Sequence, residues 1–104
     1  MDYKKEYSAV STIKGIISTG RLKLLFKPHL IILNVEEMKI IINSPKKQIL
    51  SYDDVTGIDL YYSHYCADMD IETAKKRFRI KCLGIESAQE IKDVLNSYIW
   101  EKMH

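Results

Sequence analysis

The sequence predicts a mainly β fold, a sandwich or barrel of about seven antiparallel strands capped by one C-terminal helix over residues 87–103. Three observations predict it. Alternation of apolar and polar residues, which is typical of half-buried strands, occurs at 21–27 and 77–82, and short β-branched and aliphatic runs occupy 29–33 and 38–42. The period changes to a helical one only after Gly84. At 104 residues, with no linker or repeat, the chain is expected to form a single domain over 1–104.

Short strands are predicted first in the N-terminal half, at 9–17, 21–27, 29–33, 38–42 and 48–50. The 21–27 segment alternates apolar residues with Arg21, Lys23 and Lys27, which predicts a half-buried strand with a basic outer face. Turns are expected at 34–37 and at 44–47, because proline fixes φ and removes a hydrogen-bond donor from the ladder.

Two further strands are predicted at 55–62 and 77–82, and the helix follows them. Ser87 and Glu90 have the spacing of a capping box, which marks a helix start. One apolar stripe is then formed by Ile91, Val94, Leu95, Tyr98 and Ile99. Trp100 lies about 180° around the helix from Ile91, so we expect it to pack elsewhere or to be exposed.

The order of strands, corners and helix resembles that of the pleckstrin-homology-like superfamily, in its bacterial PH and GRAM-like branch. The resemblance is carried by KGII at 14–17, GRL at 20–22, KIII at 39–42, the corner ILSYDDVTGI at 49–58, and FRI at 78–80 followed by SAQE at 87–90. It implies two nearly orthogonal antiparallel sheets, with the C-terminal helix closing one open end. It also implies a scaffold for recognition rather than for catalysis.

Charge is distributed unevenly along the chain. Residues 1–50 hold nine Lys or Arg against four Asp or Glu, whereas residues 51–104 hold seven against ten. The basic half resembles the anionic-headgroup motif of phosphoinositide-binding PH domains. That resemblance implies Lys14, Arg21, Lys23 and Lys27 as ligands of lipid phosphates, and so a peripheral membrane protein. The alternative interpretation is the solvated face of ordinary strands.

Two other kinds of partner are consistent with the sequence. Arg77, Arg79 and Lys81 form an outward basic row that could attract a nucleic-acid backbone, although Phe26 and Phe78 fall on the inward faces and offer no stacking platform. Tyr61, Tyr65 and Trp100 are candidate contact residues for a protein partner, and an open sheet edge could pair with a partner or a second copy. A protein-binding or self-associating module is our first sequence-based hypothesis, membrane binding the second and nucleic-acid binding the third.

Catalysis, cofactors and metals find no support in the sequence. It contains no nucleophile elbow and no glycine-rich phosphate loop. Potential metal ligands gather only at 63–72, which is interpreted as a solvated loop because the spacing matches no established site; they are His64, Cys66, Asp68 and Asp70. Cys82 is predicted to be a small buried hydrophobe rather than half of a disulfide framework.

The expected location is the cytoplasm, with peripheral membrane contact in the second hypothesis. No apolar run approaches the roughly 20 residues that a membrane span needs. The first residues do not read as a signal peptide.

Overall fold

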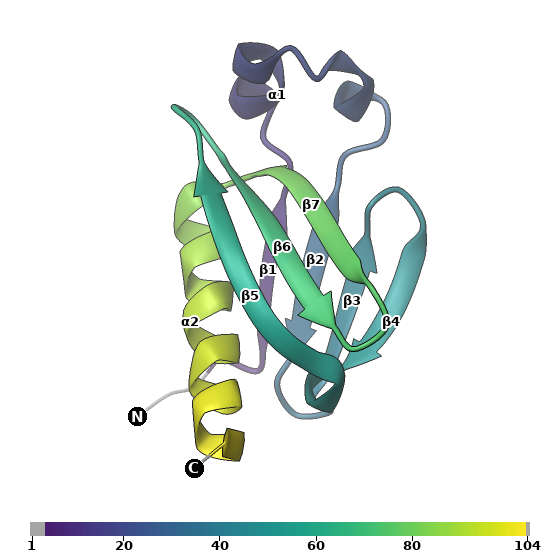
Figure 1. Ribbon diagram of the computed structural model, residues 1–104. Helices are drawn as coiled ribbons and strands as arrows, with labels where there is room; N and C mark the ends of the chain where they lie inside the picture. Colours follow the sequence, from purple (N-terminus) through teal and green to yellow (C-terminus); the bar gives the residue numbers. More distant parts are fainter. Residues whose placement is uncertain (1–3, 104) are drawn as a thin grey trace.

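The computed structural model describes residues 4–103 and contains two antiparallel sheets and a long C-terminal helix (Figure 1). The first sheet has the order β1-β2-β3-β4, with β1 at Glu6–Val10, β2 at Leu30–Asn34, β3 at Lys39–Asn43 and β4 at Lys47–Ser51. The second has the order β5-β6-β7, with β5 at Val55–Tyr62, β6 at Ala67–Thr73 and β7 at Arg77–Leu83. The two sheets are not closed into a barrel.

A single large core lies between the sheets and the helix. In the first sheet, the pairs Ile31 with Ile42 and Leu33 with Ile40 face inward and are fully buried. The residues between them in sequence turn to the other face, as the two-residue period of a strand requires. The second sheet and the helix complete the core with Met69, Ile71, Ile80, Ala88, Ile91 and Leu95.

The C-terminal helix α2, at Ile85–Met103, packs against β5 and β1 and so joins the two sheets along one side (Figure 1). The predicted apolar stripe is confirmed: Ile91 and Leu95 are fully buried, and the other three members pack against the core. Trp100 is 64% exposed, which is one of the two outcomes expected from its position opposite the stripe. The helix begins two residues earlier than predicted, so Ser87 lies inside its first turn and is not the N-cap.

Several predicted strands are confirmed. The 55–62 strand matches β5, and the predictions at 29–33, 38–42, 48–50 and 77–82 match β2, β3, β4 and β7 to within one residue at each end. The turn at 44–47 is also present and contains a cis bond between Ser44 and Pro45.

The predictions of strands at 9–17 and 21–27 were wrong over most of their length. The first strand ends at Val10, and α1 follows at Ile13–Thr19. The Thr12 hydroxyl caps this helix by accepting from the Gly15 amide at 3.1 Å, and Gly20 ends it with φ of 72°. The next segment forms a 3-10 helix, η1, at Leu22–Leu25, in which only Leu24 is buried. Its alternation of leucine and lysine therefore does not reflect a sheet.

The prediction of a solvated loop at 63–72 was also wrong, because most of this segment is the central strand of the second sheet. Residues 66–71 are all buried, and they include Asp68 and Asp70. Their carboxylates made the segment look solvated, but each is paired with an arginine. The predicted number of strands is thus right for residues 4–103, while the identity of two of them is not.

Candidate functional site

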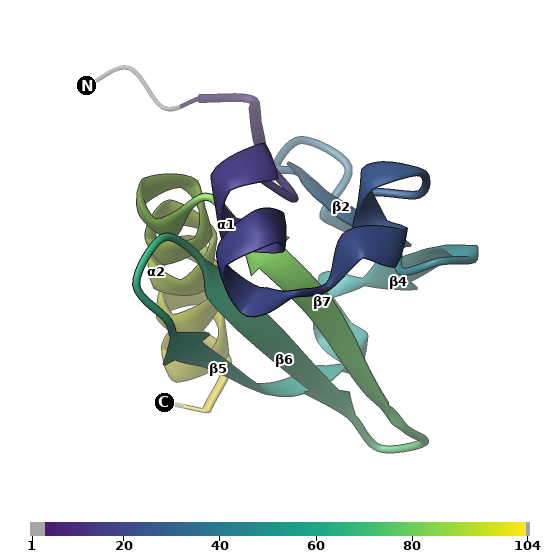
Figure 2. The ribbon, with the colours of Figure 1, turned by 90° about the horizontal axis from the view of Figure 1, so that it is seen from above.

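The connection between β1 and β2 stands out from the two-sheet body. We call residues 12–27 the crest; it comprises α1, η1 and their flanking turns. It sits over one end of the sheets, away from the last turn of α2 (Figures 1 and 2). Figure 2 shows α1 and η1 side by side across this end of the molecule.

The crest exposes apolar side chains that a packed domain normally buries. Phe26 is 88% exposed, and Ile13 and Ile17, one turn apart on α1, are 68% and 59% exposed. Leu22 and Leu25, one turn apart on η1, are also exposed. Single exposed apolar residues are common on small domains, but so many within one short segment are not, so the crest is the candidate interaction surface.

Cations surround these apolar residues. Lys14, Lys23 and Lys27 are exposed on the crest, and the sequence holds no Asp or Glu between Glu6 and Glu36. Among residues 4–103, no carboxylate forms an ion pair with any of these three lysines. The Lys14 ammonium lies 5.0 Å from the centre of the Tyr65 ring, which brings an exposed aromatic residue to the edge of the crest. The crest is therefore both apolar and positively charged.

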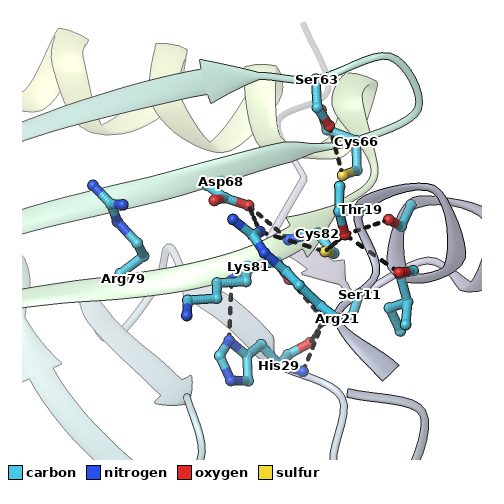
Figure 3. A network of polar contacts seen from close by, with 12 residues as sticks. Ser11, Thr19, Arg21, His29, Ser63, Cys66, Asp68, Arg79, Lys81 and Cys82 are labelled. Carbon is cyan, nitrogen blue, oxygen red and sulfur yellow. Dashed lines mark hydrogen bonds and ion pairs between the residues drawn. The ribbon is translucent and has the colours of Figure 1, made fainter. Parts of the chain in front are cut away.

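A pocket of about 330 Å³ opens beneath the crest. Basic side chains from three parts of the chain line it: Arg21 and Lys23 from the crest, His29 from the residue before β2, and Lys81 from β7. The His29 Nδ1 accepts a hydrogen bond from the Lys81 amide at 3.0 Å, so the imidazole is neutral and carries its proton on Nε2 (Figure 3). Burial, together with the charge of Lys81, lowers the pKa of His29.

Arg21 anchors the crest to the second sheet. Its Nη1 donates to Asp68 Oδ1 at 2.7 Å, and the same oxygen accepts from the Cys82 amide at 3.0 Å (Figure 3). Burial alone would raise the pKa of Asp68, but the hydrogen bonds from Arg21 and Cys82 outweigh it and hold that pKa below its usual value. Asp68 is thus an ionised, satisfied partner of Arg21.

The four predicted headgroup residues all lie on the crest, but they do not form one cluster. Arg21 and Lys23 line the basic pocket, whereas Lys14 lies beside Tyr65. Lys27 lines a separate hollow with Pro28 and Pro45. Lys81, predicted as part of an outward row, joins the pocket instead.

The three predicted protein-contact residues make different contacts. Tyr65 lies at the crest, while Tyr61 on β5 is covered by the Arg79 guanidinium at 5.2 Å from its ring centre. Trp100 is on α2 near its C-terminal end, far from the crest along the helix (Figure 1). Trp100 therefore does not share a surface with Tyr65.

The potential metal ligands between residues 64 and 70 form contacts with other parts of the protein. Asp70 accepts two hydrogen bonds from Arg79, at 2.6 and 2.9 Å, and Asp68 is paired with Arg21. Cys66 is fully buried beside Ser63. Within residues 4–103 no group of three or more His, Cys, Asp or Glu side chains is placed to hold a metal ion.

Sequence reasoning missed two members of the pocket and the apolar side of the crest. His29 and Lys81 come from segments 52 residues apart, and only the packing of β2 against β7 brings them together. Of the exposed apolar residues, Leu22 and Phe26 were predicted to lie on the buried face of a strand. A usable signal was present in the long stretch without acidic residues and in the Thr12 and Gly20 caps.

Comparison of the chain with protein-family models, with curated proteins and with solved structures finds no match.

Proposed function

We propose that this chain is a non-catalytic, pleckstrin-homology-like module that binds anionic membrane surfaces peripherally through the crest. The observation that carries the proposal is the combination of exposed Ile13, Ile17 and Phe26 with exposed lysines in a segment that has no acidic residue. Apolar side chains enter the headgroup and acyl boundary, while cations are attracted to anionic lipids. The two sheets of four and three strands, followed by a helix, agree with the order of elements that the resemblance implies. Two of the segments that carry the resemblance differ from it, because KGII at 14–17 lies in α1 and GRL at 20–22 leads into η1 rather than forming strands.

The expected strength of this binding is modest. Each Lys or Arg near an anionic surface contributes about 1 kcal/mol, and each buried methylene contributes about 0.8 kcal/mol. Three exposed lysines and a partly inserted phenylalanine then support reversible binding rather than permanent anchoring. No helix among residues 4–103 has the length and apolar character needed to cross a membrane.

The basic pocket offers a place for one lipid phosphate beneath the inserted side chains. Lys23 and Lys81 supply ammonium donors, and His29 supplies an Nε2 proton. The charge of Arg21 is neutralised by Asp68, so we assign Arg21 a positioning role, in which it holds the crest over the pocket. Phosphate oxygens require several donors at once, and this pocket brings together donors from three segments.

The other two hypotheses have weaker support. The basic row on β7 is largely neutralised, because Arg77 pairs with Glu72 and Arg79 pairs with Asp70, which leaves little charge there for a nucleic-acid backbone. Protein binding remains the alternative use of the same apolar crest. Membrane binding accounts for the lysines around it as well as for the apolar residues.

The test is sedimentation of the full chain with vesicles of phosphatidylcholine alone and with added phosphatidylserine. We expect binding only to the anionic vesicles, and release as salt is raised. Lys14→Glu and Lys23→Glu should each weaken binding about tenfold or more, since each reversal replaces attraction by repulsion worth roughly 2 kcal/mol. Lys75→Glu, an exposed lysine in the β6–β7 turn, is the matched control and should bind nearly as the wild type does.

A second pair of variants separates apolar insertion from charge. Phe26→Ala should weaken vesicle binding, whereas Trp100→Ala, which removes another exposed aromatic side chain away from the crest, should not. Light scattering without vesicles completes the experiment. If the crest variants change the oligomeric mass of the protein and leave vesicle binding unchanged, the crest binds protein and the membrane proposal fails.

A further inference from the structure

Beneath the crest lies a second, small apolar cluster that is distinct from the main core. It consists of Ile16 and Leu24 from the crest, of Cys66 immediately before β6, and of Cys82 from β7. Both cysteines are free thiols and fully buried. The two thiols neighbour each other, and the Cys82 thiol contributes to raising the pKa of Cys66, after the larger effect of burial.

The backbone brings the second thiol to this position through an irregularity. Ala67 pairs with Leu83, but the register of β6 and β7 shifts between Ala67 and Met69. Cys82 lies in the bulge and has φ of 61°, a left-handed conformation that costs energy for a residue with a side chain. Bulges re-aim side chains and are common beside functional sites. Here the bulge leaves the Cys82 side chain in the same buried cluster as Cys66, and the residues next to the two cysteines, Ala67 and Leu83, pair directly.

The surroundings of the two sulfurs differ. Cys82 Sγ is 3.6 Å from Arg21 Nη1 and 3.4 Å from Thr19 Oγ1, while Cys66 Sγ is 3.0 Å from Ser63 Oγ (Figure 3). Reactive thiols lie beside cations at partly exposed sites; Cys82 has the cation, Arg21, but is fully buried, so it reacts only when the crest opens. Burial raises the pKa of the Cys66 thiol, which keeps it protonated at neutral pH. Cys82 is therefore the sulfur suited to react first, with Cys66 as the resolving thiol.

We propose that Cys66 and Cys82 form a redox modification site, in which a peroxide converts the thiol pair into an intramolecular disulfide. The Cys82 sulfur attacks one peroxide oxygen, the O–O bond breaks, and a sulfenic acid and one water are formed. The Cys66 sulfur then displaces the hydroxyl group from the sulfenic acid, forming the S–S bond and a second water. The sulfurs lose two electrons, which reduce one peroxide to two waters.

The crest covers this site, so the two are coupled. Gly15 lies so close to Cys66 that a Cβ built on it would be 2.5 Å from Cys66 Cβ and 2.8 Å from its sulfur. Thr19 and Arg21 contact the Cys82 sulfur. Forming a bond of about 2.05 Å between the sulfurs moves them relative to all of these contacts. Oxidation therefore loosens the crest, and opening of the crest admits the oxidant.

The experiment treats the full-length chain with hydrogen peroxide and measures intact mass and a non-reducing peptide map. We expect the loss of two hydrogen atoms per monomer, a peptide linking Cys66 to Cys82, and reversal by a thiol reductant. Cys66→Ser and Cys82→Ser should each abolish the linked product. Oxidation only to sulfinic or sulfonic acids, or disulfides only between chains, overturns the proposal.

A pair of neighbouring variants tests access through the crest. Ile16→Ala removes a buried member of the cluster, so disulfide formation should be at least about tenfold faster because the crest opens more often. Ile17→Ala, the exposed neighbour on α1, should react at the wild-type rate. Equal rates in the two variants would show that the crest does not control the thiols.

Hydrogen exchange then measures the effect on the crest directly. Amides of residues 13–25 should exchange faster in the oxidised protein, and unchanged exchange there contradicts the coupling. A last measurement, which rests on the proposed function, compares the binding of oxidised and reduced protein to anionic vesicles. We expect weaker binding after oxidation. If the disulfide forms and loosens the crest, but neither the oxidised nor the reduced protein binds vesicles, the membrane-binding proposal is wrong and the redox proposal is supported.

Discussion

Gly15 on α1 and Cys66 before β6 are in closer contact than any other residue type at position 15 allows. A Cβ at position 15 would also meet the Thr12 hydroxyl at 2.8 Å, so the helix could not shift toward its own cap to relieve the clash. The glycine is required here by close approach, since it has an ordinary negative φ. This contact determines how closely α1 of the crest packs against the second sheet.

Gly15→Ala is therefore expected to destabilise the protein, although alanine is the better helix former by about 1 kcal/mol. The steric cost of overpacking, about 1–3 kcal/mol, exceeds that gain. Urea unfolding measures the difference. Gly84→Ala is the control, because a Cβ there would lie 3.7 Å from Thr12 Cγ2, an ordinary contact. Equal free energies of unfolding for the two variants would show that the Cys66 side chain can move aside at no energetic cost.

The ion pair of Arg21 with Asp68 should couple the crest to the second sheet. Arg21→Met leaves the buried Asp68 with the Cys82 amide as its remaining donor, and we expect a loss of about 1–2 kcal/mol. The lower part of that range is favoured because 36% of the Arg21 side chain is exposed and solvent screens the pair. A double-mutant cycle with Asp68→Asn should give a coupling energy above about 0.5 kcal/mol. Additive effects would contradict a direct interaction.

Much of the fold was predictable because it follows from local patterns. Short β-branched and aliphatic runs predicted β2 and β3, alternation predicted β7, and the stripe around Ile91 and Leu95 predicted the buried face of α2. The crest was not predictable in this way. Ile13, Ile17 and Phe26 are exposed in the structure. Sequence reasoning that places apolar residues in the core therefore assigns these three residues wrongly.

Only the positively charged residues of the candidate site were predictable from the sequence. Lys14, Lys23 and Lys27 were identified as cations of the basic half, and they are exposed on the crest. Asp68 was misread as solvated because its partner, Arg21, lies 47 residues away in sequence. The approach of two such residues is fixed by how the sheets pack, and a single sequence carries no direct signal of it. The same reason hides the neighbouring positions of Cys66 and Cys82.

Met38, in the turn between β2 and β3, has φ of 55° and is partly exposed. Asparagine tolerates this left-handed conformation, whereas a β-branched residue does not. Met38→Asn should therefore be more stable than Met38→Val by about 1 kcal/mol in urea unfolding. The same two substitutions at Glu37, the exposed neighbour whose φ is not positive, should differ by less. A similar gap at both positions would show that the left-handed backbone is not the cause.

His29 should make the stability of the protein depend on pH between neutrality and mild acid. Burial and the nearby charges of Lys81 and Arg21 lower its pKa and outweigh the opposing effect of Asp68. The unfolded chain therefore binds a proton at His29 more readily than the folded protein does. The stability that neutral, buried His29 provides is fully present above its pKa in the unfolded chain, about 6.5. It is lost as the pH falls toward the lower pKa of His29 in the folded protein.

The free energy of unfolding should accordingly decrease below about pH 6.5, with a slope that approaches about 1.4 kcal/mol per pH unit for one proton. His29→Asn should remove this slope, because the asparagine Oδ1 can accept the Lys81 amide as Nδ1 does but does not titrate. His64→Asn, at an exposed histidine, should keep the slope. Chemical denaturation of the three proteins at several pH values measures it, and a slope that survives His29→Asn would assign the titration to another group.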